Sequence, residues 1–332
     1  METQRRFAAE RVGLSDRDGH HFGTKAVSMR GISRRKFLKT ASASLAFAAA
    51  CTDAPWLTAN PLGLPLGLQL YSVRDLLPTD YAGTLGKLSA LGYREVEAAG
   101  FFGRSASDVK QAMEQAGLRC VSAHYSYADL APRLDEAIEF ARTLGLAYII
   151  CASPALPDGS PAKSADKKVA REAMTLDDWR WNAEQFNRTG ERVNAAGIKF
   201  GYHNHTAEFR TVDGVVIYDE LLRLTDPAKV TMEMDCGWVI VAGKNPVDYF
   251  RRYPRRISLL HVKDFKLGAG PGSDTDPPPS AELGRGSIDY HPIFAAAKQT
   301  DVQHAFIEQE QYDMPTLEAL QLDAEYMKAL TV

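Results

Sequence analysis

The chain has 332 residues, of which 45% are hydrophobic and 24% are charged, and its formal net charge is −3. This composition is typical of a globular protein with a large core, and the length suits one α/β barrel or two smaller domains. The slightly negative charge gives no reason to expect a polyanionic partner such as nucleic acid. Beyond residue 60 there is no apolar run of about 18 residues, which excludes a membrane-spanning helix from that part of the sequence.

Residues 1–60 have the features of an export signal rather than those of a folded domain. The segment SRRKFLK at 33–39 is typical of a twin-arginine signal, and a short alanine-rich apolar region follows it. Residues 1–28 are long and mixed in charge for such a signal, so Met29 is an alternative start. We therefore expect export to the periplasm, with Cys51 as a candidate lipid anchor or the neighbour of a peptidase site.

A repeated pattern organises the remaining sequence, residues 61–332. Amphipathic runs end at a glycine, and a short apolar segment follows each of them. Glycine adopts the left-handed conformation after a helix without a Cβ penalty. Helix, glycine and strand in repetition predict βα units around a parallel sheet. The glycines are Gly92, Gly117, Gly145 and Gly197.

Eight strands follow from this register. Eight βα units without a glycine-rich dinucleotide motif favour one closed (β/α)8 TIM barrel over an open doubly wound sheet. Two connections, 153–176 and 265–287, are longer than a barrel needs and leave the carboxyl ends of strands, where barrel active sites lie, so they are candidate lids or solvated insertions. The expected strands are 66–72, 93–98, 119–124, 147–152, 198–204, 230–235, 256–262 and 304–309. The expected helices include 105–116, with Ser105 and Asp108 as a capping box, 128–144, 177–196 and 315–329.

Polar side chains gather at the ends of strands five to eight. Side chains alternate between the two faces of a strand, so each strand end sends its polar groups to one side. So many charges in a barrel lumen require a cation or a ligand to neutralise them. The pairs that share a face are His203 with His205, Glu233 with Asp235, His261 with Lys263, and Glu308 with Glu310.

Four of these side chains form a candidate site for one divalent metal ion. Mixed nitrogen and oxygen ligands suit Mn²⁺, Co²⁺, Zn²⁺ or Fe²⁺ better than Ca²⁺. Alone, a histidine at a strand end is more often a hydrogen-bonded core residue, and a glutamate there could be a salt-bridge partner, but the positions on four consecutive strands favour a metal. The predicted ligands are His203, Asp235, His261 and Glu308.

The strand ends also resemble a known family, the sugar phosphate isomerase/epimerase superfamily of xylose isomerase-like barrels. The Tyr-His run on strand five is most similar to the inosose dehydratase-like branch. The resemblance extends from about residue 66 to the C-terminus. It is specific for the superfamily and weak for the substrate, because related barrels isomerise, epimerise, dehydrate or cut DNA at abasic sites. The matching segments are 92–97, 202–209, 235–238, 261–264 and 283–289.

The resemblance implies that Asp235, His261 and Glu308 are metal ligands and that His203 stands where the epimerases have a glutamate. In those epimerases two glutamates exchange protons on the two faces of the sugar. Because only Glu308 keeps this role here, the resemblance implies proton abstraction from one side, followed by isomerisation or by loss of a β-substituent.

The expected chemistry assigns further roles. A metal that chelates a carbonyl and its neighbouring hydroxyl stabilises the enediolate formed when the α-proton leaves. Glu308 is the first candidate for the base, and His205 is the second. Lys263 is expected to hold or protonate the developing oxyanion, unless it forms a salt bridge with a carboxylate such as Asp264. The candidate substrate contacts are Glu97, His124, Gln69, Trp238 and Arg285.

We therefore expect an exported, divalent-metal-dependent enzyme of the sugar isomerase/epimerase type that enolises a non-phosphorylated keto-sugar. The alternative is a dehydratase or lyase that eliminates a β-substituent from an inosose or a 3-keto-glycoside, and a further alternative is a non-catalytic sugar-binding barrel. The export signal, the acidic balance and the shortage of ligands for a three-metal cluster disfavour an abasic-site endonuclease. The expected partner is a small sugar, and a homo-oligomer is left open.

Overall fold

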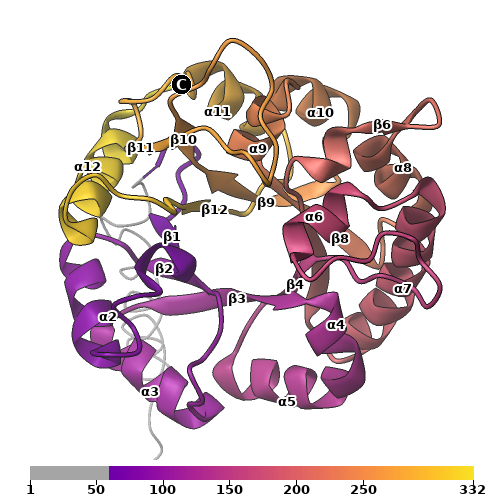
Figure 1. Cartoon of the computed structure of the whole chain (residues 1–332). Coiled ribbons are helices and arrows are strands. Elements are labelled where there is room, and N and C mark those ends of the chain that lie inside the picture. Colours follow the sequence, from indigo (N-terminus) through magenta and orange to yellow (C-terminus); the bar gives the residue numbers. More distant parts are fainter. Residues whose placement is uncertain (1–59) are drawn as a thin grey trace, which may run out of the picture. The chain divides into compact units, whose positions relative to one another are not determined.

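The computed structural model describes residues 60–332, so the predicted signal, Met29 and Cys51 lie outside the described part of the chain. Eight parallel strands close into a barrel in the order β1-β12-β9-β8-β5-β4-β3-β2, and helices surround it (Figure 1). The predicted (β/α)8 barrel is confirmed. The barrel strands are β1 (Gly67–Gln69), β2 (Glu95–Ala98), β3 (Arg119–Ser126), β4 (Tyr148–Ser153), β5 (Lys199–His203), β8 (Val230–Asp235), β9 (Ile257–Val262) and β12 (His304–Ile307).

The helices begin and end where local chemistry dictates. Ser105 Oγ accepts a hydrogen bond from the Asp108 N–H (3.2 Å) at the start of α3, and Gly117 ends that helix with a φ of 69°. None of the described helices is long and apolar enough to cross a membrane. The main helices are α2 (Tyr81–Ala90), α3 (Ala106–Ala116), α5 (Leu134–Leu144), α7 (Leu176–Ala195), α8 (Ile217–Leu224), α10 (Pro246–Arg252), α11 (His291–Ala297) and α12 (Thr316–Ala329).

Two predicted elements differ from the structure. The strand expected over 66–72 ends at Gln69, whose side chain accepts a hydrogen bond from the Tyr71 N–H (3.0 Å) and so caps the 3-10 helix η2 (Leu70–Val73). The helix expected over 128–144 is divided into α4 (Tyr127–Leu130), η3 (Ala131–Arg133) and α5. Pro132 lies at this division, and it has no N–H to continue the hydrogen-bonded ladder.

The barrel lumen has an apolar layer below a polar layer. The apolar layer is fully buried and consists of Val121, Tyr148, Ile150, Leu259 and Phe306. Because side chains alternate along a strand, the next inward positions toward the carboxyl ends carry the polar residues. On β9 this places His261 above Leu259, and after β12 it places Glu308 above Phe306. The strand register therefore sets the depth of the candidate site.

The two long connections both contain structure at the mouth of the barrel. The first holds the short helix α6 (Lys167–Glu172), which borders the central opening (Figure 1). The second begins with β10 (Asp264–Phe265), which pairs with β11 (Ser280–Ala281) in an antiparallel ladder. A buried ion pair between Arg171 and Asp274 joins the two connections, with an Nη2–Oδ2 distance of 2.6 Å.

Candidate active site

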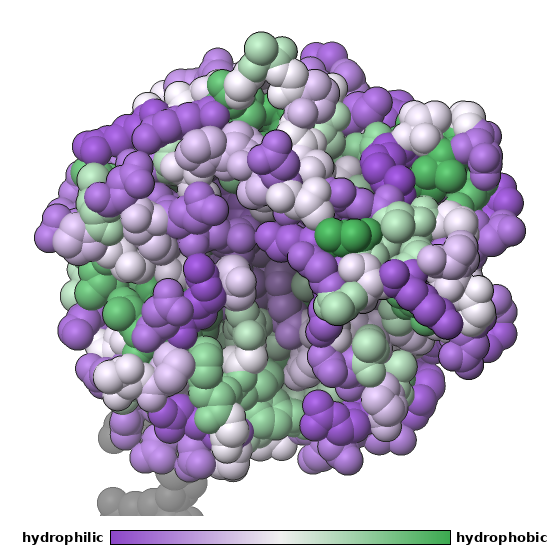
Figure 2. All heavy atoms as spheres, viewed as in Figure 1, coloured by the Kyte–Doolittle hydropathy of each residue, from purple (hydrophilic) through white to green (hydrophobic). Residues whose placement is uncertain are grey.

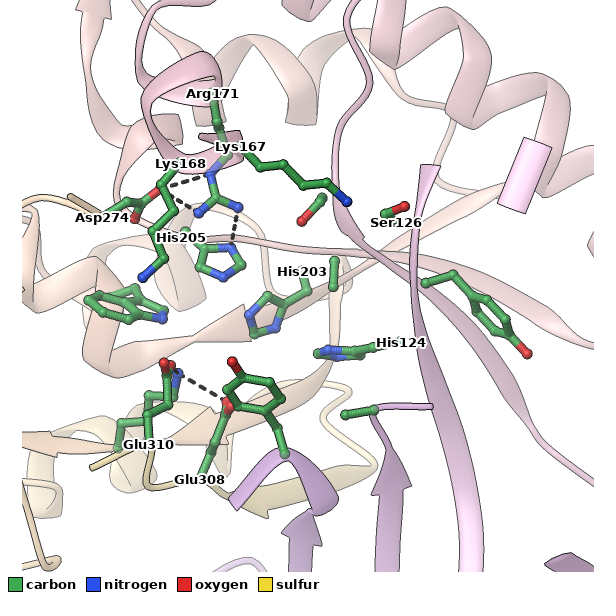
Figure 3. A pocket seen from close by; sticks show the side chains of 17 residues that line it. His124, Ser126, Lys167, Lys168, Arg171, His203, His205, Asp274, Glu308 and Glu310 are labelled. Atoms are coloured by element: carbon green, nitrogen blue, oxygen red, sulfur yellow. Dashed lines mark hydrogen bonds and ion pairs between the residues drawn. The ribbon is translucent and has the colours of Figure 1, made fainter. Parts of the chain in front are cut away.

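A cavity of about 520 Å³ opens at the carboxyl ends of the barrel strands. Figure 2 shows this face hollowed at its centre, where hydrophilic residues gather. In Figure 3 the side chains of α6 approach from one side, Glu308 and Glu310 lie on the opposite side, and histidines lie between them. The predicted site residues among its lining are His124, His203, His205, Trp238, Lys263 and Glu308.

Imidazoles and carboxylates alternate at the bottom of this cavity. His124 Nε2 lies 2.7 Å from Glu97 Oε1 and 2.6 Å from Glu233 Oε2. Glu233 Oε2 also lies 3.0 Å from His203 Nδ1 and 3.4 Å from His261 Nε2. One ligand atom from each of His124, His203, Glu233 and His261 falls within 4.8 Å of all the others, which makes this deep group a candidate metal site.

A second group lies nearer the carboxyl ends of the strands and shares His261 with the first. His261 Nδ1 lies 2.7 Å from Glu308 Oε2 and 3.9 Å from Asp235 Oδ2. Lys263 Nζ lies 3.3 Å from Asp235, 3.0 Å from Glu308 and 2.6 Å from Glu310. Asp235, His261 and Glu308 form this shallow group, in which ligand atoms again lie within 4.8 Å of one another. The predicted ligands are thus divided, with His203 in the deep group.

The carboxylates of the two groups differ in proton affinity. Burial and the neighbouring charge of Glu97 together raise the pKa of Glu233 to about 7, against the opposing effect of the histidines. Burial also disfavours the ionised form of Glu308, but the charges of Lys263 and His261 outweigh it and lower the pKa to about 2. Glu308 is therefore ionised at neutral pH, whereas Glu233 can hold a proton there.

The imidazoles also differ in proton affinity. Burial lowers the pKa of His124, but Glu97 and Glu233 outweigh it and raise the value to about 9. The carboxylates around His261 raise its pKa above the usual range in the same way. Burial and the nearby cations lower the pKa of His203, which favours the neutral ring that a metal requires.

The charges of the cluster are unbalanced unless protons or a cation are present. The carboxylates of Glu97, Glu233, Asp235 and Glu308 are buried, and Lys263 is the one lysine in contact with them among the described residues. Three of their oxygens, Glu97 Oε2, Glu233 Oε1 and Asp235 Oδ2, are buried without a hydrogen-bond partner. Buried carboxylates are stable when paired or bound to a metal, so the residues present fit a divalent cation.

His205 has a defined tautomer. Its Nδ1 lies 3.1 Å from Arg171 Nη1, and a guanidinium can only donate, so Nδ1 is the acceptor. Burial and the Arg171 charge lower the pKa of His205, so the ring stays neutral and carries its proton on Nε2. Asp274 holds Arg171 in place with a 2.8 Å bond from Nε and accepts a hydrogen bond from the Thr206 N–H (3.0 Å). His205 therefore offers an N–H donor rather than a lone pair at Nε2.

The sequence profile of the xylose isomerase-like TIM barrel family matches residues 85–330. The chain belongs to this family. It is 25% identical over 240 residues to the inosose dehydratase of Lacticaseibacillus casei, which covers 65% of this chain and 77% of that relative. The structure of a sugar phosphate isomerase/epimerase from Parabacteroides distasonis matches with a TM-score of 0.63 and 27% identity, over 80% of this chain and 93% of that one. The resemblance inferred from the sequence is confirmed.

A more distant structure shares the fold alone. It is that of an IOLI protein with a bound zinc atom, at a TM-score of 0.57 and 13% identity, over 79% of this chain and 95% of that one. This likeness therefore bears on the fold of the xylose isomerase-like barrel and not on its site.

Three predicted substrate contacts do not line the cavity of this xylose isomerase-like barrel. Gln69 and Glu97 lie beneath it, where Gln69 Nε2 donates to Glu97 Oε1 (2.7 Å). Arg285 is exposed on the loop at 283–289. Asp264 organises that loop, because its carboxylate accepts hydrogen bonds at 3.0 Å from three backbone N–H groups, those of Gly284, Gly286 and Ile288. Lys263 does form ion pairs with carboxylates, but its partners are Asp235, Glu308 and Glu310 rather than Asp264.

The structure also adds residues that the predicted site did not include. The alternation of side chains already placed Glu233 beside Asp235 and Glu310 beside Glu308, and that signal could have assigned them. Other additions come from the two long connections, where the sequence holds no signal for the contact. They are Lys167, Lys168, Arg171 and Asp274.

Proposed function

We propose that the chain is a divalent-metal-dependent enzyme that enolises a keto-sugar or a ketone of a cyclic polyol and then eliminates an oxygen substituent β to the carbonyl. The observation that carries this proposal is the cluster around His261, in which four buried carboxylates face one lysine and three carboxylate oxygens have no hydrogen-bond partner. The matched inosose dehydratase supports the same reaction type.

The deep and shallow groups supply the ligands for the metal. Both contain His261, and together they offer nitrogen and carboxylate oxygen donors, which suit Mn²⁺, Co²⁺, Zn²⁺ or Fe²⁺. The zinc atom in the distant IOLI structure is consistent with this range. A bound divalent ion supplies a Lewis acid that polarises the substrate carbonyl.

Glu308 is the proposed base. It lines the cavity, and its low pKa keeps it ionised at neutral pH. Lys263 lies 3.0 Å from it. As negative charge develops on the enolate oxygen, the ammonium group of Lys263 is attracted to that oxygen and away from Glu308. The proton affinity of Glu308 then rises at the moment when it receives the α-proton.

A single carboxylate can complete an elimination from one side. The C–H bond breaks and its proton goes to Glu308, while the electron pair forms the enolate. The electrons then form the C=C bond, the β C–O bond breaks, and Glu308 returns the proton to the departing oxygen. His205 donates a hydrogen bond from Nε2 to the substrate, so its tautomer favours a donor role over the base role expected from the sequence.

Epimerisation requires a second base on the opposite face of the sugar. The other carboxylates that line the cavity are Glu310, which follows Glu308 on the same segment, and Asp274, which Arg171 binds. The neutral ring of His203 is a weak base because burial lowers its pKa. This one-sided arrangement favours elimination over epimerisation.

The proposal is tested with purified, metal-loaded protein and an inosose, with NMR detection of the product. Elimination predicts loss of one water molecule per turnover and a new alkene or enol signal. Solvent exchange at the α-carbon with every hydroxyl retained would instead assign an isomerase or epimerase. Absence of both reactions with inososes and other keto-sugars would contradict an enolising enzyme.

We also propose that the chain is exported through its twin-arginine segment and therefore acts on a non-phosphorylated sugar, with Cys51 as a candidate lipid anchor. Residues 33–39 support this proposal. The test is fractionation of cells that express the full chain. Replacing Arg34 and Arg35 together by lysine is expected to keep the protein in the cytoplasm, and an unchanged distribution would contradict export by this route.

A further inference from the structure

A second cavity adjoins the first at the mouth of the barrel. Its volume is about 400 Å³, and it lies between the start of the long connection 153–176 and helix α6. The two cavities have several lining residues in common, so they form one continuous cleft with two compartments. The shared residues are Ser126, Ser153, Lys167, Lys168, Arg171 and His205.

The second compartment differs from the first in chemistry. The first contains Asp274, Glu308 and Glu310, whereas the described residues that line the second include no carboxylate. Most of its accessible surface is apolar, and half-buried and buried apolar side chains contribute to it beside Lys167, Lys168 and Arg171. The apolar residues are Pro154, Ala155, Leu156, Ala170 and Met174. A wall of this kind favours an apolar group over a second hydroxyl-rich sugar.

The wall is held in place by buried hydrogen bonds. Asn182 is fully buried on α7 and binds both backbone groups of Ala155, accepting from its N–H (3.0 Å) and donating to its carbonyl (2.8 Å). Arg210 donates to the carbonyl of Met174 (3.1 Å), and the pair of Arg171 with Asp274 fixes α6. The compartment is therefore formed before any ligand enters.

We propose that this second compartment binds an apolar, ring-sized group attached to the sugar, so that the substrates are glycosides with an aromatic aglycone rather than free monosaccharides. This inference rests on the proposed function only in that a sugar occupies the first compartment. Lys167 and Lys168 line both compartments, so these two side chains lie at the boundary between them. Both side chains are exposed in the cleft, so they are available to the oxygen that links sugar and aglycone.

The test compares two glycosides that lack a ketone and so are not consumed, 4-nitrophenyl β-D-glucoside and methyl β-D-glucoside. Isothermal titration calorimetry of the metal-loaded protein measures both dissociation constants. Burial of the aryl ring predicts that the 4-nitrophenyl glycoside binds at least about tenfold more tightly. Equal affinities, or no binding of the aryl glycoside at its solubility limit, would overturn the proposal.

Two matched variants locate the effect. Leu156→Asp places a charge in the second compartment alone and is expected to abolish the preference for the aryl glycoside, while Leu156→Ala reduces it. Val169→Asp adds the same charge on α6 at a position that is exposed and lines neither cavity, so the preference should remain. Equal effects of the two Asp variants would overturn the assignment. An aryl preference without any enolisation would leave the subsite in place and contradict only the proposed reaction.

Discussion

At the scale of single residues, His261 joins the two candidate ligand groups. Its Nδ1 faces Glu308 at 2.7 Å, and its Nε2 faces Glu97 at 2.8 Å and Glu233 at 3.4 Å. An imidazole between carboxylates is either protonated or a neutral ligand with a cation beside it. We predict that His261 is a neutral ligand beside a bound cation in the active protein.

Glu233→Gln tests the deep group directly. The substitution removes a carboxylate whose Oε1 has no partner, and we expect the affinity for Zn²⁺ or Mn²⁺ to fall more than tenfold. Glu310→Gln is the matched control, because Glu310 contacts Lys263 but belongs to neither ligand group. Metal titration of both variants checks the prediction, and equal affinities would show that the metal does not use Glu233.

The tautomer of His205 is a second prediction at this scale. The hydrogen bond from Arg171 requires an unprotonated Nδ1 and a protonated Nε2. NMR of ¹⁵N-histidine-labelled protein distinguishes the two nitrogens, with a His205→Gln variant to assign the signal. A signal from protonated Nδ1 at neutral pH would contradict the donor role.

The sequence predicted the residues that strand alternation controls and missed those that depend on contacts between loops. Asp235, His261 and Lys263 lie close together because each occupies an inward position at the carboxyl end of its strand. The pair of Arg171 and Asp274 joins residues 103 positions apart in two irregular connections. No local periodicity encodes such a contact, so only the structure could show it.

At the scale of elements, the glycines that end helices allow the positions of the following strands to be predicted. Gly117, Gly145 and Gly197 have φ values of 69°, 84° and 80°, so each ends a helix in the left-handed conformation before the next strand. The prediction of one helix over 128–144 is less accurate. The apolar periodicity continues through Pro132, but the backbone hydrogen bonds of the helix do not. Backbone chemistry that overrides side-chain periodicity accounts for that difference.

Two helical glycines should respond in opposite directions to alanine. In α7, a Cβ on Gly190 would overlap the backbone carbonyl of Lys229, so Gly190→Ala is expected to destabilise the protein by about 1–3 kcal/mol. In α2, Gly86 is exposed and a Cβ would meet no atom within 4 Å, so Gly86→Ala should stabilise it by about 1 kcal/mol. Urea unfolding of both variants is the measurement. A stabilising Gly190→Ala would contradict the close approach of α7 to the start of β8.

Helix α12 carries a pH-dependent contact with the loop at 283–289. Asp323 Oδ1 accepts a hydrogen bond from the Leu283 N–H (2.7 Å), Oδ2 has no partner, and burial raises the pKa of Asp323 to about 7. The unfolded carboxyl ionises near pH 4. Folding therefore loses stability as pH rises from about 4 to about 7, because the unfolded state releases its proton first.

Asp323→Asn keeps an acceptor for Leu283 and removes this penalty. The variant should gain about 2 kcal/mol more relative to the wild type at pH 8 than at pH 5. Glu318→Gln, at an exposed position of the same helix, is the control for the loss of a charge. Urea unfolding at pH 5 and pH 8 is the measurement. A gain in stability that is the same at both pH values would contradict a raised pKa of the buried Asp323 carboxyl.

At the scale of the whole molecule, the apolar layer of the lumen supports the polar cluster from below, and the two long connections bound it from above. This arrangement leaves the cavity open at the carboxyl ends of the strands, as in other (β/α)8 barrels. Protons on the histidines or a bound cation balance the buried carboxylates. The central claim is that this cation and Glu308 together enolise a carbonyl compound.

The most direct test is proton exchange in D₂O, followed by ¹H NMR on inososes and keto-sugars. We predict that the metal-loaded protein exchanges a proton on a carbon next to the carbonyl. Removal of the metal by a chelator should abolish the exchange, and Glu308→Gln should slow it by a factor of about 10² or more. Exchange that persists at the same rate in the chelated protein or in Glu308→Gln, or that fails with every carbonyl substrate, would contradict the account.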